Sequence, residues 1–245
     1  MSTAHKLHFR EVTSTNDVAK EVLRVIDSVV VSADHQTTGR GRRGREWHDV
    51  PGQSVLISFG QRHNVERTAV DLAADMARGS LAILQMLRGY GLDEVIRCKY
   101  PNDIQGRDES GWSKLAGVLV EHEFLGSRCH STVIGIGMNV LQECFPETIG
   151  QPTTSLRRLG SDRSPSEIVA DLIPAIERMQ MTDSYHVFDI WREELLKRRL
   201  TIRIEGSEGL WQAVDLDDSG RLVVMNNNDE TQRIIDNGDS IRYVD

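Results

Sequence analysis

The sequence predicts an α+β fold, in which a large domain of strands and helices is followed by a small β-barrel. Two observations support this. β-Branched runs such as SVVVSADHQ alternate with helical patterns along most of the chain. Beyond Leu200 the pattern changes to short strand-like segments separated by turn residues, namely LTIRIE, LWQAVDLD, RLVVMN, TQRIID and SIRYV. Small all-β modules of this kind commonly close into barrels. We therefore expect one domain at 1–198 and a second at 199–245.

The first predicted helix begins near Ser14. The stretch STNDVAKEVLRVI has apolar residues at helical spacing, and Ser14 with Asp17 resembles a capping box. SVVVSADHQ and QSVLISFG predict strands on either side of a polar loop. A long helical pattern then covers residues 64–88 and is closed by Gly89 and Gly91.

The middle of the chain alternates apolar and polar segments. EVIRCKY, KLAGVLVEHEF and STVIGIGMNV are strand candidates, and DIQGRDESGWS between the first two is expected to be a polar loop. Ser164 and Pro165 predict the N-cap and first residue of another helix, and HVFDIWREELLKRR predicts the last one. No apolar stretch has the length of a membrane span and the N-terminus lacks a signal-peptide pattern, so we expect a cytoplasmic protein.

Composition excludes several classes of function. The net charge of -8 argues against a general nucleic-acid binder. The three cysteines have no C-x-x-C spacing, which argues against a disulfide framework or a zinc site. Against this acidic background the stretch GRGRRGREW, residues 39–47, indicates a local anion site, because it contains Arg40, Arg42, Arg43 and Arg45.

The glycines of GRGRRGREW match the G-x-G-x-x-G dinucleotide fingerprint, but the context does not. That fingerprint requires a helix immediately after it, whereas here Pro51 and Gly52 interrupt the chain within a few residues. A Walker A pattern is absent as well. Glycine allows close backbone approach to a ligand, and guanidinium groups bind carboxylate or phosphate bidentately. The loop is therefore predicted to hold an anion, with a solvated basic turn as the alternative.

Further stretches accompany this loop in a fixed order. They are STN (14–16), KYPND (99–103), SKLAGVLVE (113–121), GIGMNV (135–140) and TTSL (153–156). With them the chain resembles the biotin protein ligases, also called biotin acetyl-CoA-carboxylase ligases, from Glu11 to its end. The resemblance implies a class II synthetase-like domain, with a mixed sheet flanked by helices, and an SH3-like C-terminal barrel. It also implies that biotin is activated with MgATP to biotinyl-5'-AMP and transferred to a lysine of a biotin carboxyl carrier domain.

The resemblance assigns roles to individual residues. Because a carboxylate attacks a phosphate, the site must supply positive charge where the two anions meet. The catalytic candidates are Arg42, Lys114, Lys99 and Asp103, with Asp103 as a base for the acceptor lysine, whose reference pKa of about 10.4 leaves it charged. Residues matched to biotin are Ser14, Thr15, Asn16, Gln36, Gly39, Arg40, Gly41, Arg42 and Lys114. Residues matched to the nucleotide are Arg42, Arg45, Trp47, Asn102, Lys114 and Asn139. No metal site made by protein alone is expected, and Mg²⁺ would arrive with ATP near Asp103.

Some of these residues also have purely structural interpretations. Ser14 can be an N-cap, Asn102 a turn residue after Pro101, and Asp103 an Asx-type cap. Lys114 can be a charge at a strand end whose alkyl chain covers apolar surface.

The chain departs from the common family pattern in three places. Tyr100 stands where tryptophan is more frequent, the segment GRDESGW is longer than in compact members, and few residues precede Ser14. The last feature leaves no room for a winged-helix domain, so no repressor function and no nucleic-acid partner are expected. A homodimer is possible.

Two other functions remain open from the sequence. One is a lipoate or octanoate ligase or transferase, which shares the catalytic fold. The other is a non-catalytic module whose arginine loop binds an anionic partner, such as a nucleic acid or a phosphorylated protein.

Overall fold

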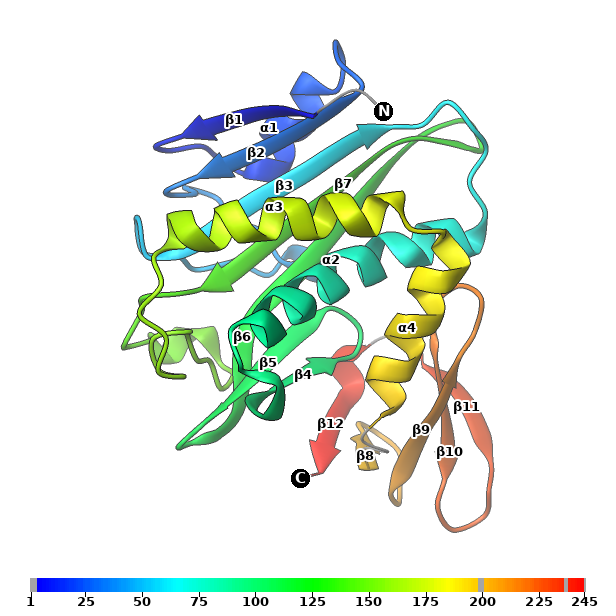
Figure 1. The fold of residues 1–245 in the computed structure, drawn as a ribbon. Coiled ribbons are helices and arrows are strands. Elements are labelled where there is room, and N and C mark those ends of the chain that lie inside the picture. The colour runs from blue at the N-terminus through cyan, green and yellow to red at the C-terminus, as the bar shows by residue number, and fades with distance from the viewer. Residues whose placement is uncertain (1–3, 198–200, 236–237, 245) are drawn as a thin grey trace.

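A seven-stranded mixed sheet forms the framework of the computed structural model, which describes residues 4–197, 201–235 and 238–244 (Figure 1). The strand order is β1-β2-β3-β7-β6-β5-β4, and of these pairs β1 and β2 run parallel while the others are antiparallel. The strands are β1 (His5–Phe9), β2 (Ser28–Ala33), β3 (Ser54–Arg62), β4 (Ile96–Lys99), β5 (Asp103–Asp108), β6 (Gly111–Leu125) and β7 (Arg128–Asn139). The predicted mixed sheet flanked by helices is confirmed.

Helices cover both faces of this sheet (Figure 1). Helix α1 (Thr15–Val22) packs on one face, and the other face is covered by α2 (Ala69–Gly89), α3 (Pro165–Met181) and α4 (Ser184–Leu196). Strand β7 follows the resulting alternation. Val133 packs under α1, whereas Ile134 and Ile136 belong to the main core beneath α2. Among the residues that the structure describes, no helix combines the length and the apolar composition that crossing a bilayer requires.

Close contact between α2 and the sheet depends on a glycine. A Cβ at Gly79 would lie 2.7 Å from Val118 Cγ1 and 3.0 Å from Ile134 Cγ2. The absent side chain therefore allows the helix to approach β6 and β7 directly. Short 3-10 turns connect the larger elements, namely η1 (Arg42–Gly44), η2 (Asp93–Val95), η3 (Glu147–Ile149) and η4 (Gly238–Ser240).

The C-terminal segments form a second, antiparallel sheet with the order β11-β10-β9-β8-β12. Its strands are β8 (Thr201–Ile204), β9 (Trp211–Leu216), β10 (Leu222–Asn226), β11 (Gln232–Ile235) and β12 (Ile241–Val244). All five predicted strands are confirmed, although within the described residues no ladder closes β11 onto β12. The predicted boundary between 198 and 199 lies outside the described residues, so the division into two domains stays a prediction. Trp191 of α4 and Trp211 of β9 belong to one core cluster that links the two sheets.

One strand of the structure was not predicted, and one segment predicted as a loop is a hairpin. Strand β1 was not predicted from HKLHF. The expected polar loop DIQGRDESGWS instead forms β5 and the start of β6, which pair as a hairpin around Gly111, with φ of 103°. Several of its polar side chains are buried and bind other segments: Gln105 accepts from Arg97, and Asp108 accepts from Thr154. Gly106 of this hairpin packs tightly, because a Cβ there would lie 2.6 Å from Leu159 Cδ1.

Helix starts were predicted with mixed success. Ser14 is the N-cap of α1, but its side chain makes no capping hydrogen bond, so the predicted capping box with Asp17 is wrong. The Asp17 carboxylate binds Arg40 instead. Helix α2 begins at Ala69, not at residue 64, because Thr68 and Asp71 form a reciprocal capping box there. Ser164 caps α3 as predicted.

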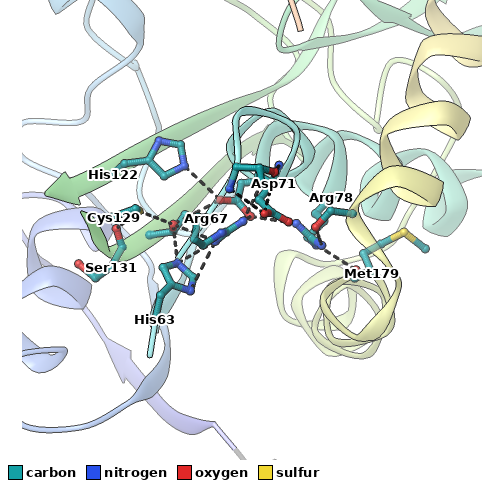
Figure 2. Close-up of polar contacts among 12 residues, drawn as sticks. His63, Arg67, Asp71, Arg78, His122, Cys129, Ser131 and Met179 are labelled. Atoms are coloured by element: carbon teal, nitrogen blue, oxygen red, sulfur yellow. Dashed lines mark hydrogen bonds and ion pairs between the residues drawn. The ribbon is translucent and has the colours of Figure 1, made fainter. Parts of the chain in front are cut away.

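A buried charged cluster holds the helical layer together (Figure 2). Asp75 of α2 accepts hydrogen bonds from Arg67 and Arg78, both at 3.0 Å, and from His122 of β6 at 3.1 Å. Arg78 also donates to the carbonyl oxygens of Met179, in the last turn of α3, and of Thr182, which follows that helix. The Asp75 side chain is 5% exposed and that of Arg78 is 8% exposed. Burial acts to raise the pKa of the Asp75 carboxyl, but the hydrogen bond from His122 and the two guanidinium groups hold it below its ordinary value.

His63 lies at the edge of this cluster and makes the stability of the fold pH-dependent. Burial, assisted by the positive charge of Arg67, lowers the pKa of His63 from 6.5 to about 4. The folded state therefore resists protonation of this ring, and stability should be lost as the pH falls from about 6.5 through 4. We expect a loss on the order of 1–2 kcal/mol after screening around the partly exposed ring.

Urea unfolding measured between pH 7 and pH 4 tests this expectation. The wild-type protein should lose stability more steeply than His63→Gln, because the variant has no ring to protonate. His186→Gln, at an exposed position of α4, serves as the matched control and should follow the wild type. Parallel curves for the wild type and His63→Gln would contradict the assignment.

Candidate functional site

A cavity of about 430 Å³ opens on the α1 face of the large sheet, in the volume range of small-molecule sites. The N-terminus of α1, the arginine loop at residues 39–47 and the glycines of β6 and β7 surround it. The predicted site residues that line it are Ser14, Thr15, Asn16, Gln36, Arg40, Gly41, Arg42, Arg45, Trp47, Lys99, Asn102, Asp103, Lys114 and Asn139. Gly39 does not line the cavity. It packs behind the loop, where a Cβ would lie 2.7 Å from the carbonyl oxygen of Trp47.

Glycines of two neighbouring strands form the floor of the cavity. Gly117 of β6 and Gly137 of β7 are directly opposite in the ladder, and the indole of Trp47 lies across both. A Cβ at Gly137 would lie 2.5 Å from Trp47 Cε2. The Trp47 Nε1 is buried and has no hydrogen-bond partner within the described residues. The two glycines therefore let the indole pack flat against the sheet, and the ring supplies an apolar floor to the cavity.

Lys114 enters the cavity because of a β-bulge. Opposite β5, Ile104 pairs with Ala116 and Gln105 pairs with Lys114, so Leu115 is the extra residue. Leu115 is fully buried in the main core, whereas the side chain of Lys114 lies over Gly117 on the cavity face. Strict alternation from Gly117 would have turned Lys114 to the opposite face. The bulge therefore places a cation where the sequence pattern alone would not.

Lysines and one carboxylate gather at this end of the cavity. Lys114 Nζ lies 2.8 Å from Asp103 Oδ1, with both side chains less than one fifth exposed. Burial lowers the pKa of Lys99, and the neighbouring Lys114 charge lowers it further, against the opposing effect of Asp103. The predicted cluster of Lys99, Asp103 and Lys114 is thus brought together by the turn between β4 and β5 and the bulge in β6.

The arginine loop folds as a small hairpin. The backbone N–H of Gly41 donates to the Arg45 carbonyl at 2.7 Å, and that of Trp47 donates to the Gly39 carbonyl at 2.9 Å. Arg43 at the tip has a φ of 57°, a left-handed conformation that non-glycine residues seldom adopt. Arg42 points into the cavity, where its Nη1 donates to Asn102 Oδ1 at 3.4 Å. The loop therefore presents a cation to the KYPND turn.

Arg40 has a different partner from Arg42. Its guanidinium makes two hydrogen bonds of 2.6 Å to the Asp17 carboxylate and lies 3.6 Å from Glu121. The hydrogen bond from Arg40 lowers the pKa of Asp17. Asp17 and Glu121 neutralise this arginine, so it attaches the loop to α1 and β6 rather than contributing an unpaired positive charge to the cavity.

A polar pocket closes the other end of the cavity. The backbone N–H of Thr15 donates to Gln36 Oε1 at 2.7 Å, and the hydroxyl of Ser58 lies 2.6 Å from Asn16 Oδ1. Asn16 Nδ2 donates to Glu121 Oε2 at 2.7 Å. These bonds fix the orientation of the Thr15, Asn16 and Gln36 side chains before any ligand enters. On the far side, Asn139 Nδ2 donates to the Thr154 carbonyl and holds the TTSL segment against β7.

Several contributors to the site were missed from the sequence. Ser58 and Glu121 orient Asn16, yet both lie in strands where they resemble ordinary polar positions. The flat floor could have been inferred from the two-residue spacing of Gly135 and Gly137 in GIGMN. Arg242, together with Gly238, reaches the cavity from the C-terminal sheet, and no local signal in the sequence connects them to it.

Oxygen ligands for a metal are scarce in the cavity. Within the described residues no three His, Cys, Asp or Glu side chains gather closely enough to hold an ion. The acidic residues lining the cavity are Glu46 and Asp103, and Asp103 is paired with Lys114. The donor set fits a metal that a ligand brings with it, with Asp103 as a protein oxygen nearby.

Comparisons with known proteins agree with this geometry. The model of the biotin/lipoate A/B protein ligase family matches residues 9–139. The chain is 32% identical over 217 residues to the biotin-(acetyl-CoA-carboxylase) ligase of Mycobacterium tuberculosis, which covers 80% of this chain and 73% of the relative. It is 26% identical over 238 residues to the bifunctional ligase/repressor BirA of Bacillus subtilis, covering 91% and 70% of the two chains.

Among solved structures, the fold is similar to that of the biotin protein ligase from Aquifex aeolicus in complex with biotin and ATP. The TM-score is 0.75 at 25% sequence identity, and the match covers 99% of this chain and 100% of that chain.

Proposed function

This chain belongs to the biotin/lipoate A/B protein ligase family, and we propose that it is a biotin protein ligase. It activates biotin with ATP to biotinyl-5'-AMP and then transfers biotin to a lysine of a biotin carboxyl carrier domain. The observation that carries the proposal is the division of one cavity into a polar end, an apolar floor and a cationic end. This order matches the ureido ring, the apolar chain and the carboxylate of biotin followed by the phosphates of ATP.

The polar end suits the ureido ring. Thr15 and Gln36 present preoriented donors and acceptors there, next to the Asn16 amide. The Trp47 indole, packed on Gly117 and Gly137, supplies an apolar wall that suits the bicyclic and acyl parts of biotin. A carboxylate continuing along this floor would arrive between Arg42 and Lys114.

The first chemical step follows from that placement. A carboxylate oxygen of biotin attacks the α-phosphorus of ATP, and the bond between the α-phosphorus and the bridging oxygen breaks to release pyrophosphate. Arg42 and Lys114 reduce the repulsion between the two anions, and Lys99 adds a further positive charge. Asp103 keeps Lys114 in place through their ion pair. Asp103 would lie next to a Mg²⁺ ion carried in by ATP, which would neutralise part of the phosphate charge.

The second step needs a neutral acceptor lysine. Its amine attacks the acyl carbon, AMP leaves with the electron pair of the acyl–oxygen bond, and the amine loses a proton. Asp103 is our candidate to receive that proton, because its carboxylate lines the cavity beside Lys114. Arg45, Trp47, Asn102 and Asn139 are proposed to contact the nucleotide.

A lipoate or octanoate ligase is the second candidate. It would use the same cationic end, but neither acid has a ureido group to bind Thr15, Asn16 and Gln36. The buried polar end therefore favours biotin.

Exchange of labelled pyrophosphate into ATP tests the proposal directly, with biotin, lipoate and octanoate compared on the purified protein. Exchange that depends on biotin alone is the expected result. Exchange with lipoate or octanoate would assign the chain to the other branch of the family, and no exchange with any acid would contradict an adenylating function. Transfer to a carrier domain is then measured by label retained on the carrier lysine.

The remaining functional inferences rest on the sequence and stay predictions. These are a cytoplasmic location and a possible homodimer.

The ion pair between Asp17 and Arg40 predicts how the loop affects biotin binding. Asp17→Asn should weaken biotin binding by roughly fivefold, the size expected for a partly exposed bidentate ion pair, because the loop loses its attachment to α1. Titration calorimetry with biotin measures this. Glu21→Gln is the matched control, because Glu21 lies on the same helix as Asp17 and its carboxylate pairs with the exposed Arg24. Equal biotin affinity in both variants would show that the ion pair does not position the loop.

A further inference from the structure

Tyr100 connects the edge of the cavity to the C-terminal sheet. Its backbone N–H donates to the Tyr243 hydroxyl at 3.0 Å. Its own hydroxyl accepts from the backbone N–H of Leu222 and donates to the carbonyl of Ile235, both at 3.3 Å. These partners lie on β12, β10 and β11, and Tyr100 is 5% exposed. One residue in the turn between β4 and β5 therefore contacts three strands of the second sheet.

The same turn carries the charged groups of the cavity. Lys99 precedes Tyr100, and Asn102 and Asp103 follow it closely. Asn102 Nδ2 donates to the Val118 carbonyl at 2.9 Å, and Asp103 pairs with Lys114. A displacement of Tyr100 would consequently move both the lysine and the carboxylate that holds Lys114.

The C-terminal sheet contributes to the cavity from the other side. Gly238 and Arg242 line it. Gly238 lies against the turn so closely that a Cβ there would lie 2.9 Å from the carbonyl oxygen of Tyr100 and closer still to Pro101 Cδ. Arg97 adds a second contact between the two sheets, since its guanidinium lies 4.2 Å from the Trp112 ring of β6 and 5.3 Å from the Tyr243 ring of β12. The position of Arg242 thus depends on how the second sheet packs against this turn.

We propose that the Tyr100 hydroxyl is a positioning group that sets the C-terminal sheet against the Lys99–Asp103 turn and so fixes the cationic end of the cavity. The inference rests on the proposed ligase function. A tyrosine hydroxyl both accepts from Leu222 and donates to Ile235, whereas an indole at this position offers one donor and no acceptor. This pair of hydrogen bonds therefore requires tyrosine at a position where the family more often has tryptophan.

Tyr100→Phe tests the proposal because it removes only the hydroxyl. Nucleotide binding is measured by calorimetry with an ATP analogue whose α,β-bridge is methylene, so that pyrophosphate cannot leave, and biotin binding is measured separately. We expect about tenfold weaker binding of the analogue, the size of a lost buried hydrogen bond, and a clearly smaller loss of biotin binding. The polar end that would hold the ureido ring is expected to be unaffected because α1 and β3 form it, away from the turn, so only the carboxylate of biotin would meet the altered cationic end.

Matched variants separate positioning from stability. Tyr90→Phe also removes a hydroxyl, which donates to Asp171 of α3 away from the cavity. This variant should bind the analogue and biotin as the wild type does. Gly238→Ala retains the Tyr100 hydroxyl but inserts a methyl group at the same contact, and should reproduce the selective loss of nucleotide affinity. Gly89→Ala, where an added Cβ meets nothing within 4 Å, is its control.

The outcomes distinguish this inference from the proposed function. If Tyr100→Phe lowers the melting temperature but binds the analogue as the wild type does, the hydroxyl only stabilises the fold and the inference is wrong. A wild type that binds the analogue without catalysing biotin-dependent exchange would overturn the proposed function, while the affinity of Tyr100→Phe would still decide the positioning role. No binding of the analogue by the wild type would overturn both.

Discussion

Replacement of Lys114 by alanine is expected to lower biotin-dependent pyrophosphate exchange by about a hundredfold to a thousandfold, the usual cost of removing one charged or hydrogen-bonding group aimed at a developing anion. Lys114 Nζ lies over Gly117 at the cationic end, where the biotin carboxylate and the α-phosphate would meet. The loss should appear mainly in kcat, since the interaction is strongest in the transition state.

Two further variants make this prediction specific. Lys6→Ala also breaks a lysine–carboxylate pair, with Glu177 at 3.8 Å, but Lys6 does not line the cavity, so we expect little change. Lys114→Arg keeps the charge in a different shape and should retain part of the activity. A loss of less than tenfold in Lys114→Ala would contradict the catalytic role and favour a non-catalytic anion-binding module.

Replacement of Asp75 by alanine is expected to lower the free energy of unfolding by about 3–5 kcal/mol, because it leaves Arg67 and Arg78 buried without their shared carboxylate. Figure 2 shows both arginines and His122 converging on this part of α2. Urea unfolding followed by circular dichroism measures the change. Asp75→Asn should lie between alanine and the wild type, since an amide can still accept one of the hydrogen bonds.

A surface carboxylate provides the control for this effect. Asp27 pairs with Arg62 but its side chain is 74% exposed, so Asp27→Ala should change stability by less than about 1 kcal/mol. The charged cluster lies on the face of the sheet that α2, α3 and α4 cover, opposite the cavity on the α1 face. We therefore expect Asp75→Asn, at a temperature where it is folded, to retain the biotin affinity of the wild type. Similar stability losses for Asp75→Ala and Asp27→Ala would show that the buried network is dispensable.

Most secondary structure was predictable because its signals are local. Periodicity located β2, β3, β6 and β7, and turn residues separated the five C-terminal strands correctly. The hairpin of β5 and the start of β6 was mispredicted because its polar side chains find partners elsewhere in the fold, as Gln105 does in Arg97 and Asp108 does in Thr154. The capping box at Ser14 was mispredicted for a different reason. Asp17 had a distant partner in Arg40, which competes for its carboxylate.

The residues of the candidate site were largely predictable from their motifs, whereas their partners were not. The predicted residues line one cavity with the exception of Gly39. That Arg40 is neutralised by Asp17 while Arg42 faces the cavity could not be read from the alternating glycines and arginines of the loop. The same applies to Ser58 and Glu121, which orient Asn16.

The sequence by itself therefore determined most of the elements, their order and the kinds of chemical groups available to the site, because periodicity, turn composition and charge act over a few residues. Only the tertiary structure decided which groups meet. The bulge at Leu115 turns Lys114 into the cavity, Asn16 meets Glu121 across more than 100 residues of chain, and Arg242 arrives from the second sheet. Strand register and packing between sheets control these contacts, and neither is encoded in any short stretch of sequence.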